Sequence, residues 1–110
     1  MKYLSNAFSL SMLTGRETDL HVTEISRETF CTEISGSESA IGHAGTAAAL
    51  STVCNKQIPF NRITLKLQPG DVLYVAQIMF RLAEGQILSF EELMGYISSG
   101  MLKFYKVQVM

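Results

Sequence analysis

The sequence has few of the residues that metal sites and disulfide frameworks require. Its 110 residues include no tryptophan, two prolines, two cysteines and two histidines. Cys31 and Cys54 do not form a CxxC pair, and with His21 and His43 they give no zinc ligand set at a known spacing. We therefore expect no metal site and no cofactor.

Long apolar runs and a secretory signal are also missing. No stretch has the length and hydropathy of a membrane span, and the first residues lack the charged and apolar regions of a signal peptide. The two cysteines could form one bridge, but this pattern favours a reduced, intracellular, soluble protein that does not act on a membrane.

Charge is sparse as well. Charged residues make up 17% of the chain, its net charge is -1 and its pI is near 6.1. Without a basic field, non-specific binding to DNA or RNA is disfavoured, whereas a small anionic ligand in a local pocket is not. DNA is therefore not an expected partner.

Apolar residues are abundant, at 47% of the chain. A chain of this length fits one domain, residues 1–110, with a single core and little margin of stability. The apolar residues that such a core cannot cover make self-association an expectation.

The order of the periodic segments predicts an α/β domain: a mixed central β-sheet of about five strands packed with helices. Residues 2–8 suit a central strand, whereas the two lysines of 102–109 suggest a strand on or near an edge. Alternation within 61–67 places Ile63, Leu65 and Leu67 on a core face and Arg62 on the opposite one. The expected strands are 2–8, 20–22, 61–67, 72–80 and 102–109, and the expected helices are 26–34, 43–54 and 89–98.

One stretch, SAIGHAGT at residues 39–46 (here called the octet), has a composition that suits a catalytic or ligand-binding site. The alanines that follow it predict a helix over 43–54, with Ser39 or Gly42 near its start. The unpaired N–H groups of the first turn suit a phosphate, Gly45 would let a ligand approach, and Thr46 would add a hydroxyl donor. His43 could then protonate a leaving oxygen. The alternative is a serine cap, a glycine turn and a histidine without a special role.

Several polar residues elsewhere have two interpretations. Gln77 lies on the same face of an apolar strand as Arg81 and needs a partner, which could be backbone, another subunit or a ligand. Arg81 and Glu84 could simply pair with each other. Asn6 and Ser9 could end the first strand by local hydrogen bonds or donate to a ligand. With Arg62, these residues outline an anion pocket.

The motifs occur in an order that matches a small viral family: NAFS at 6–9, AIGH at 40–43 with Thr46, Asn61-Arg62 entering a strand, Pro69-Gly70-Asp71, and RLAEGQIL at 81–88. In this order and spacing the chain resembles the anti-CRISPR ring nucleases of archaeal viruses, bacteriophages and mobile elements, over nearly all of its length. The resemblance implies a homodimer in the host cytoplasm that binds cyclic tetra-adenylate, the second messenger of type III CRISPR immunity. It also implies cleavage of this ring, without metal, to linear di-adenylate with 2′,3′-cyclic phosphate ends.

The family's roles carry over to individual positions of this chain. The resemblance makes His43 the general acid and Arg81 and Glu84 further catalytic residues. It also makes Arg62 and Arg81 the phosphate-binding arginines, and Glu84 a residue that helps to order the site. The substrate-binding residues that it implies are Asn6, Ser9, Gly42, Arg62 and Gln77. Relatives often carry a polar residue and a proline at the positions of Phe80 and Ala83. This departure concerns the rigidity of the expected turn at residues 81–85 and the rate of cleavage.

The chemistry of RNA is compatible with this assignment. A ribose 2′-hydroxyl can attack the adjacent phosphate, so a protein needs only to fix geometry, balance charge and protonate the leaving oxygen. The alternative function is a non-catalytic dimer that sequesters a cyclic nucleotide or contacts another protein. Direct nucleic-acid binding is a weaker third option.

Overall fold

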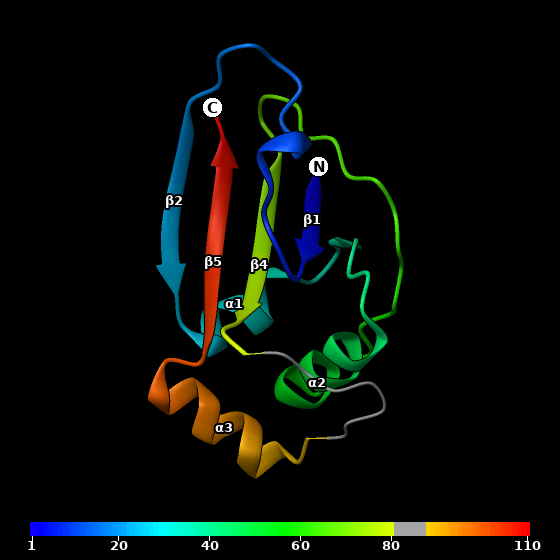
Figure 1. The fold of residues 1–110 in the computed structure, drawn as a ribbon, viewed down its shortest axis with the longest axis vertical. Helices are drawn as coiled ribbons and strands as arrows, with labels where there is room; N and C mark the ends of the chain where they lie inside the picture. Colours follow the sequence, from blue (N-terminus) through cyan, green and yellow to red (C-terminus); the bar gives the residue numbers. More distant parts are fainter. Residues whose placement is uncertain (81–87) are drawn as a thin grey trace.

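The computed structural model describes residues 1–80 and 88–110, and within them it contains one five-stranded mixed sheet. The strand order is β2-β5-β4-β1-β3, in which β1 runs parallel to β3 and β4, and β5 runs antiparallel to β4 and β2 (Figure 1). The predicted α/β class with a mixed sheet is confirmed. The strands are β1 (Lys2–Ser5), β2 (Leu20–Ile25), β3 (Glu38–Ser39), β4 (Val72–Ile78) and β5 (Leu102–Val109).

Each predicted helix is present, and local capping explains where each begins. The helices are α1 (Arg27–Glu33), α2 (Ala44–Cys54) and α3 (Phe90–Ser99), with a short 3-10 helix, η1 (Leu10–Met12). Ser26 caps α1, and Ser89 with Glu92 forms a reciprocal capping box at α3. Gly100 ends α3 with φ +80°, a left-handed conformation that glycine adopts without strain.

The three α-helices contribute to one core, on one face of the sheet. Phe30 of α1, Leu50 of α2 and Leu93 of α3 are buried against a face that includes Leu4 and Phe104. The Phe30 and Phe104 rings have centroids 4.6 Å apart. Full burial of each such side chain is worth about 1.5–3 kcal/mol. This core holds α2, and with it the octet, against the sheet.

Irregular chain covers the other face. Leu65 and Leu67 are buried there as predicted, but Ile63 is 41% exposed, and residues 61–67 do not form the predicted strand. A single parallel bridge joins Leu67 to Leu13. The prediction failed because the Asn61 backbone donates to Ile41 O, so this segment follows the octet instead of pairing with a sheet strand.

Strand positions differ from the predictions in two further ways. β5 is not at an edge but lies between β2 and β4. Its lysines are accommodated by acidic partners, since Lys106 Nζ lies 3.2 Å from Glu33 Oε1 and Lys103 Nζ lies 3.9 Å from Glu24 Oε1. The short β3 was not predicted, and it makes β1 an internal strand, as expected.

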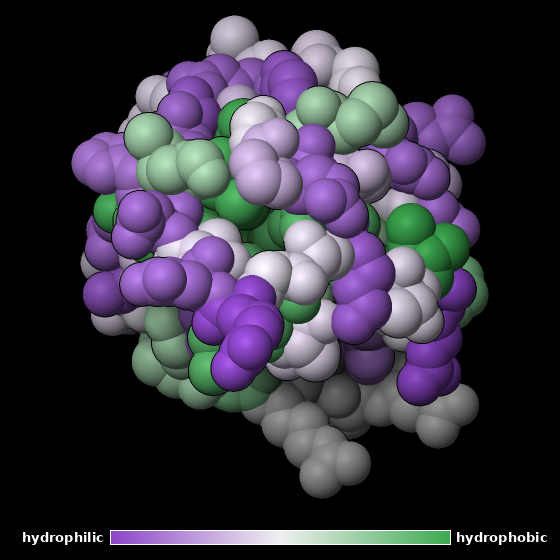
Figure 2. Space-filling view, turned by 90° about the horizontal axis from the view of Figure 1, so that it is seen from above, coloured by the Kyte–Doolittle hydropathy of each residue, from purple (hydrophilic) through white to green (hydrophobic). Residues whose placement is uncertain are grey.

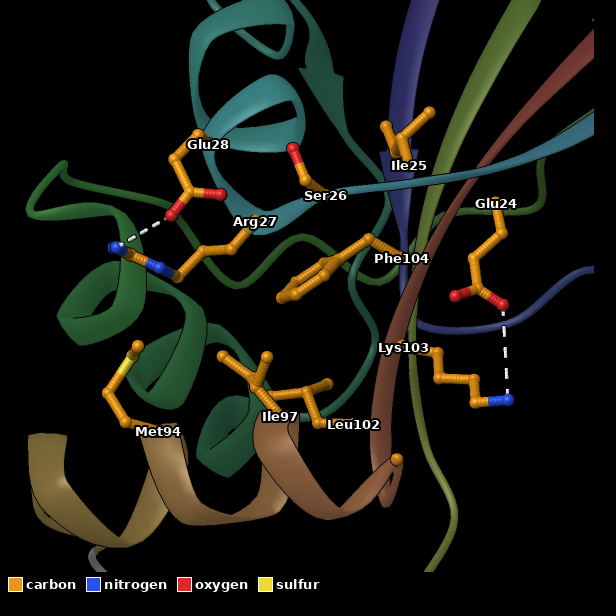
Figure 3. Close-up of a pocket in the computed structure, with 11 residues that line it drawn as sticks. Glu24, Ile25, Ser26, Arg27, Glu28, Met94, Ile97, Leu102, Lys103 and Phe104 are labelled. Atoms are coloured by element: carbon orange, nitrogen blue, oxygen red, sulfur yellow. Dashed lines mark hydrogen bonds and ion pairs between the residues drawn. The ribbon is translucent and has the colours of Figure 1, made fainter.

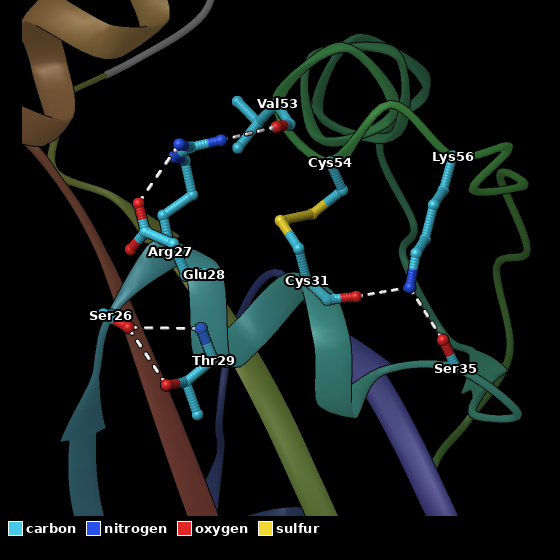
Figure 4. Close-up of a disulfide and its surroundings, with 9 residues drawn as sticks. All are labelled: Ser26, Arg27, Glu28, Thr29, Cys31, Ser35, Val53, Cys54 and Lys56. Atoms are coloured by element: carbon cyan, nitrogen blue, oxygen red, sulfur yellow. Dashed lines mark hydrogen bonds and ion pairs between the residues drawn. A yellow bond between two sulfur atoms is a disulfide. The ribbon is translucent and has the colours of Figure 1, made fainter.

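The two cysteines form a disulfide, so the expectation of reduced thiols is wrong for this structure. Cys31 in α1 and Cys54 at the end of α2 have Cα atoms 5.2 Å apart (Figure 4). Sequence spacing could not decide this, because the pairing depends on how α1 and α2 pack. Around the bridge, Arg27 donates to Val53 O at 3.4 Å, and Lys56 donates to Cys31 O and to Ser35 Oγ. These contacts fix the C-terminal end of α2.

The end of the molecule that carries both termini is covered mainly by hydrophilic side chains, with smaller hydrophobic areas between them (Figure 2). Among the helices that the structure describes, none is long and apolar enough to cross a membrane.

Candidate functional site

Four of the predicted site residues lie where the carboxyl ends of three strands meet. Asn6 follows β1, Gly42 and His43 follow β3, and Gln77 lies near the end of β4. These three strands are parallel, so their carboxyl ends meet at the same edge, where open α/β sheets commonly bind ligands (Figure 1). The topology therefore brings together groups that are far apart in the sequence.

His43 itself is the N-cap of α2, so Gly42, and not Ser39, lies next to the start of this helix. Its Nδ1 accepts a hydrogen bond from Thr46 N at 3.1 Å. An imidazole that accepts at Nδ1 is neutral and carries its proton at Nε2. The side chain is exposed, so the Nε2–H group is available to a ligand.

Thr46 differs from its predicted role. It is buried, and its hydroxyl lies 3.3 Å from His43 Nδ1, so this hydroxyl faces the imidazole and not an open ligand site. At this distance the hydroxyl can donate to Nδ1 or, where Nδ1 carries a proton, accept from it.

The two glycines of the octet leave room for neighbouring side chains. A Cβ added at Gly45 would lie 3.0 Å from His43 Cε1, and a Cβ added at Gly42 would lie 3.4 Å from Arg62 Cγ. Gly45 therefore makes space for the capping imidazole, where the sequence suggested space for a ligand. The stem of Arg62 packs over Gly42, which places the predicted phosphate-binding arginine directly beside the octet.

Hydrogen bonds hold the chain before Arg62 in place. Asn61 donates from its backbone to Ile41 O at 2.9 Å and from Nδ2 to Ser39 O at 2.7 Å. Ser39 is buried, and its hydroxyl donates to Pro59 O at 2.7 Å. The roles of Ser39 and Asn61 as anchors were not predicted, since they depend on contacts between residues about twenty positions apart.

The remaining predicted residues have less distinctive surroundings. Ser9 caps η1, accepting from Ser11 N at 3.3 Å, which is the local role that the sequence allowed as an alternative. Asn6 is half-buried. Gln77 is exposed, so the expected cost of burying an unpaired amide does not arise. Arg81 and Glu84 lie outside the described residues.

A charged cluster that sequence analysis missed lies on the helical face of the sheet. Tyr74 OH donates to Glu33 Oε1 at 2.9 Å, and Lys106 Nζ contacts the same oxygen. Burial, followed by the hydrogen bond to Glu33, raises the pKa of Tyr74 to about 12. The hydrogen bonds from Tyr74 and Lys106 lower the pKa of Glu33. This cluster joins α1 to β4 and β5.

A cavity of about 270 Å³ lies elsewhere, between the β2–α1 corner, α3 and β5 (Figure 3). Its apolar lining includes Ile97 and Phe104, and its rim carries the Glu24–Lys103 ion pair. None of its lining residues belongs to the octet, so this cavity is separate from the candidate site. In residues 1–80 and 88–110, no group of three or more His, Cys, Asp and Glu side chains could hold a metal ion.

Comparison with known proteins identifies the family. The model of the STIV B116-like family matches residues 2–101, which is most of the chain. The chain belongs to the STIV B116-like family. Among solved structures, B116 of Sulfolobus turreted icosahedral virus matches this STIV B116-like fold with a TM-score of 0.91, 33% identity and 97% of each chain covered.

Two relatives of this chain also come from viruses. The uncharacterized protein ORF116 of Acidianus filamentous virus 1 is 32% identical over 109 residues, which cover 97% of this chain and 94% of that protein. The uncharacterized protein 26 of Sulfolobus islandicus filamentous virus is 35% identical over 91 residues, or 80% of this chain and 76% of that protein. The similarity therefore extends over the octet and the strands that position it.

Proposed function

We propose that this STIV B116-like protein is a metal-independent ring nuclease that cleaves cyclic tetra-adenylate to linear di-adenylate with 2′,3′-cyclic phosphate ends. It acts as a homodimer in the cytoplasm of the infected host and so counters type III CRISPR immunity. The observation that supports this most directly is the exposed imidazole of His43, next in the chain to Gly42, over which the stem of Arg62 packs, where the carboxyl ends of three parallel strands meet. The viral origin of the relatives is compatible with it.

The proposed reaction uses the substrate's own nucleophile. A ribose 2′-hydroxyl attacks the adjacent phosphorus and releases its proton to water, so that a bond forms between phosphorus and the 2′-oxygen while the bond between phosphorus and the 5′-oxygen breaks. Arg62 neutralises the phosphate, since a guanidinium can donate two parallel hydrogen bonds to phosphate oxygens. Protonation of the leaving 5′-oxygen by His43 contributes roughly 100- to 10,000-fold in rate.

The capping geometry restricts how His43 can act. A neutral ring that accepts at Nδ1 and donates its proton from Nε2 would become an imidazolate, which is unfavourable. The acid form is therefore the imidazolium, in which Nδ1 carries a proton and can no longer accept from Thr46 N. The Thr46 hydroxyl, 3.3 Å from Nδ1, is then an acceptor for that proton. In this proposal Thr46 is a positioning residue for the acid.

The partner subunit supplies the second half of the site. A cyclic ligand with repeating phosphates suits a two-fold pocket, in which each subunit offers the same groups to opposite sides of the ring. Arg81, Glu84, Asn6, Ser9 and Gln77 keep the roles that the family resemblance implies.

A cleavage assay on labelled cyclic tetra-adenylate in excess chelator tests the proposal. Wild-type protein should release linear di-adenylate, whereas His43→Ala should bind the ring and leave it intact. His21→Ala is the matched control, because His21 is exposed on β2 at the far edge of the sheet and should cleave normally.

Two outcomes would contradict the proposed nuclease activity. Retention of the intact ring by wild-type protein would favour the alternative, a dimer that sequesters the nucleotide. Absence of any binding would leave a protein-interaction dimer or direct nucleic-acid binding as the remaining interpretations.

A further inference from the structure

Phe60 is an exposed aromatic residue on a fixed backbone. Its side chain is 53% exposed, although its neighbours on both sides are hydrogen-bonded to the octet. Pro59 O accepts from Ser39 Oγ at 2.7 Å, and Asn61 N donates to Ile41 O at 2.9 Å. A large apolar ring normally gains about 1.5–3 kcal/mol from burial, so its exposure on an anchored segment calls for an explanation.

The position of this ring relative to Arg62 is informative. The side chain of the intervening Asn61 is directed to Ser39 O, whereas Phe60 and Arg62 are both exposed. An extended chain spans at most about 3.3–3.6 Å per residue, so the two Cα atoms are no more than roughly 7 Å apart. Arg62 in turn packs over Gly42. An exposed aromatic residue and an exposed arginine thus lie close together in the chain segment that is anchored to the octet.

We propose that Phe60 is the stacking platform for a purine base whose adjoining phosphate binds Arg62. This inference rests on the proposed function and adds to it the residue that recognises the base. Stacking needs a π-face and no hydrogen bond, and it is worth about 1–3 kcal/mol per base. Because a purine offers a larger π-face than a pyrimidine, Phe60 favours adenine over uracil without contacting the edges of the base.

The competing occupant of this surface is a second copy of the chain. Ile63 is also exposed, at 41%, and an apolar pair of this kind could contribute to a dimer interface. The exposed Arg62 in the same segment favours the nucleotide, because a guanidinium group suits a phosphate. Measuring the oligomeric state of Phe60 variants distinguishes a bound nucleotide from a second copy of the chain.

The test measures dissociation constants in the His43→Ala background, where the ring stays intact, with cyclic tetra-adenylate and cyclic tetra-uridylate as probes. Adding Phe60→Ala should weaken binding of the adenylate ring by about 5- to 150-fold and reduce the preference for adenylate over uridylate. Phe60→Tyr should retain the preference, and Phe60→Leu should be intermediate. Val22→Ala is the control, because Val22 is 55% exposed on β2, far from the octet in strand order.

Three results would overturn the proposal. Unchanged affinity in Phe60→Ala would show that Phe60 does not stack on a base, and an equal loss of affinity for both cyclic nucleotides would show that Phe60 does not favour a purine. Dissociation of the dimer in Phe60→Ala by sedimentation, with the purine preference intact, would assign Phe60 to a subunit interface. Failure of the His43→Ala parent to bind cyclic tetra-adenylate at all would instead reject the proposed function.

Discussion

His43 Nδ1 lies 3.1 Å from Thr46 N and 3.3 Å from Thr46 Oγ1, so one residue offers the imidazole both a donor and a hydroxyl. The backbone N–H stabilises the neutral ring as the cap of α2, and the hydroxyl can accept from the protonated ring. The same pair thereby links the start of the helix to the protonation state that the proposed reaction requires.

Replacing the Thr46 hydroxyl separates the capping of α2 from the stabilisation of the protonated imidazole. Thr46→Val keeps the backbone donor, so α2 should remain capped, but it removes the acceptor for protonated Nδ1. A hydrogen bond to a charged group is worth about 1.5–3 kcal/mol, so kcat for cyclic tetra-adenylate should fall roughly 10- to 100-fold with little change in affinity. Single-turnover cleavage and equilibrium binding measure the two quantities.

The matched control is Thr52→Val, because Thr52 lies in the same helix, is exposed and donates to Ala48 O at 3.2 Å. It should cleave at the wild-type rate. Wild-type kcat in Thr46→Val, with the fold verified by circular dichroism, would remove Thr46 from the mechanism.

Arg62 should affect binding as well as rate. Arg62→Ala removes charge-assisted hydrogen bonds to phosphate, each worth about 1.5–3 kcal/mol, so affinity for cyclic tetra-adenylate should fall at least about tenfold. Arg62→Lys should recover only part of this loss, because an ammonium group cannot make the bidentate contact. Arg16→Ala, an exposed arginine in the turn before β2, is the control. Equal affinities for wild type and Arg62→Ala would contradict the phosphate pocket.

Local sequence signals identified the elements well where local contacts determine them. Ser89 and Glu92 predicted the start of α3 because a capping box is complete within four residues. Apolar residues on both faces predicted strand β4 and the internal position of β1. These predictions held for a similar reason, because a strand's preference for being covered on both faces depends on its own residues.

Contacts between distant residues account for the errors. Residues 61–67 alternate as a strand would, yet Asn61 hydrogen-bonds to the octet, which no local pattern reveals. The lysines of β5 suggested an edge because their partners, Glu24 and Glu33, come from other elements. In the candidate site, sequence located His43 and Arg62 but could not show that His43 caps α2 or that Ser39 anchors the chain before Arg62.

The disulfide should stabilise the protein substantially. Cys31 and Cys54 are separated by 23 residues, and closing a loop of that size is worth about 3 kcal/mol in the chain-entropy account. Replacing both with serine should lower the melting temperature by more than about 10 °C. Reductant should lower the melting temperature of the wild type and leave that of the double variant unchanged.

Thiol labelling supplies the check on this prediction. The unfolded wild-type protein, purified without reductant, should take up no alkylating agent at Cys31 or Cys54. Stoichiometric labelling of both residues would show that the thiols are reduced in solution, as the sequence had suggested.

The Tyr74–Glu33 hydrogen bond should make stability depend on pH in alkaline solution. The folded-state pKa of Tyr74 is raised from 10.0 to about 12, so the native state holds this proton more tightly than the unfolded chain does. Its contribution is therefore complete below pH 10 and is lost as pH rises from 10 to 12, on the order of 2–3 kcal/mol. Urea unfolding of wild type and Tyr74→Phe across this range should show a smaller alkaline loss in the variant.

Unfolding in acidic solution gives a complementary test of the Tyr74–Glu33 hydrogen bond, because the pKa of Glu33 is lowered in the folded protein. Its contribution is complete above its ordinary pKa of 4.5 and is lost as pH falls through the lower folded-state value. Tyr74→Phe removes the hydrogen bond that contributes most to the lowered pKa of Glu33, so the free energy of unfolding of this variant should fall less steeply in acid than that of the wild type. Tyr105→Phe, a half-buried tyrosine on the opposite face of β5, is the control and should retain both slopes. Parallel stability curves for wild type and Tyr74→Phe at both ends of the pH range would contradict the coupling between Tyr74 and Glu33.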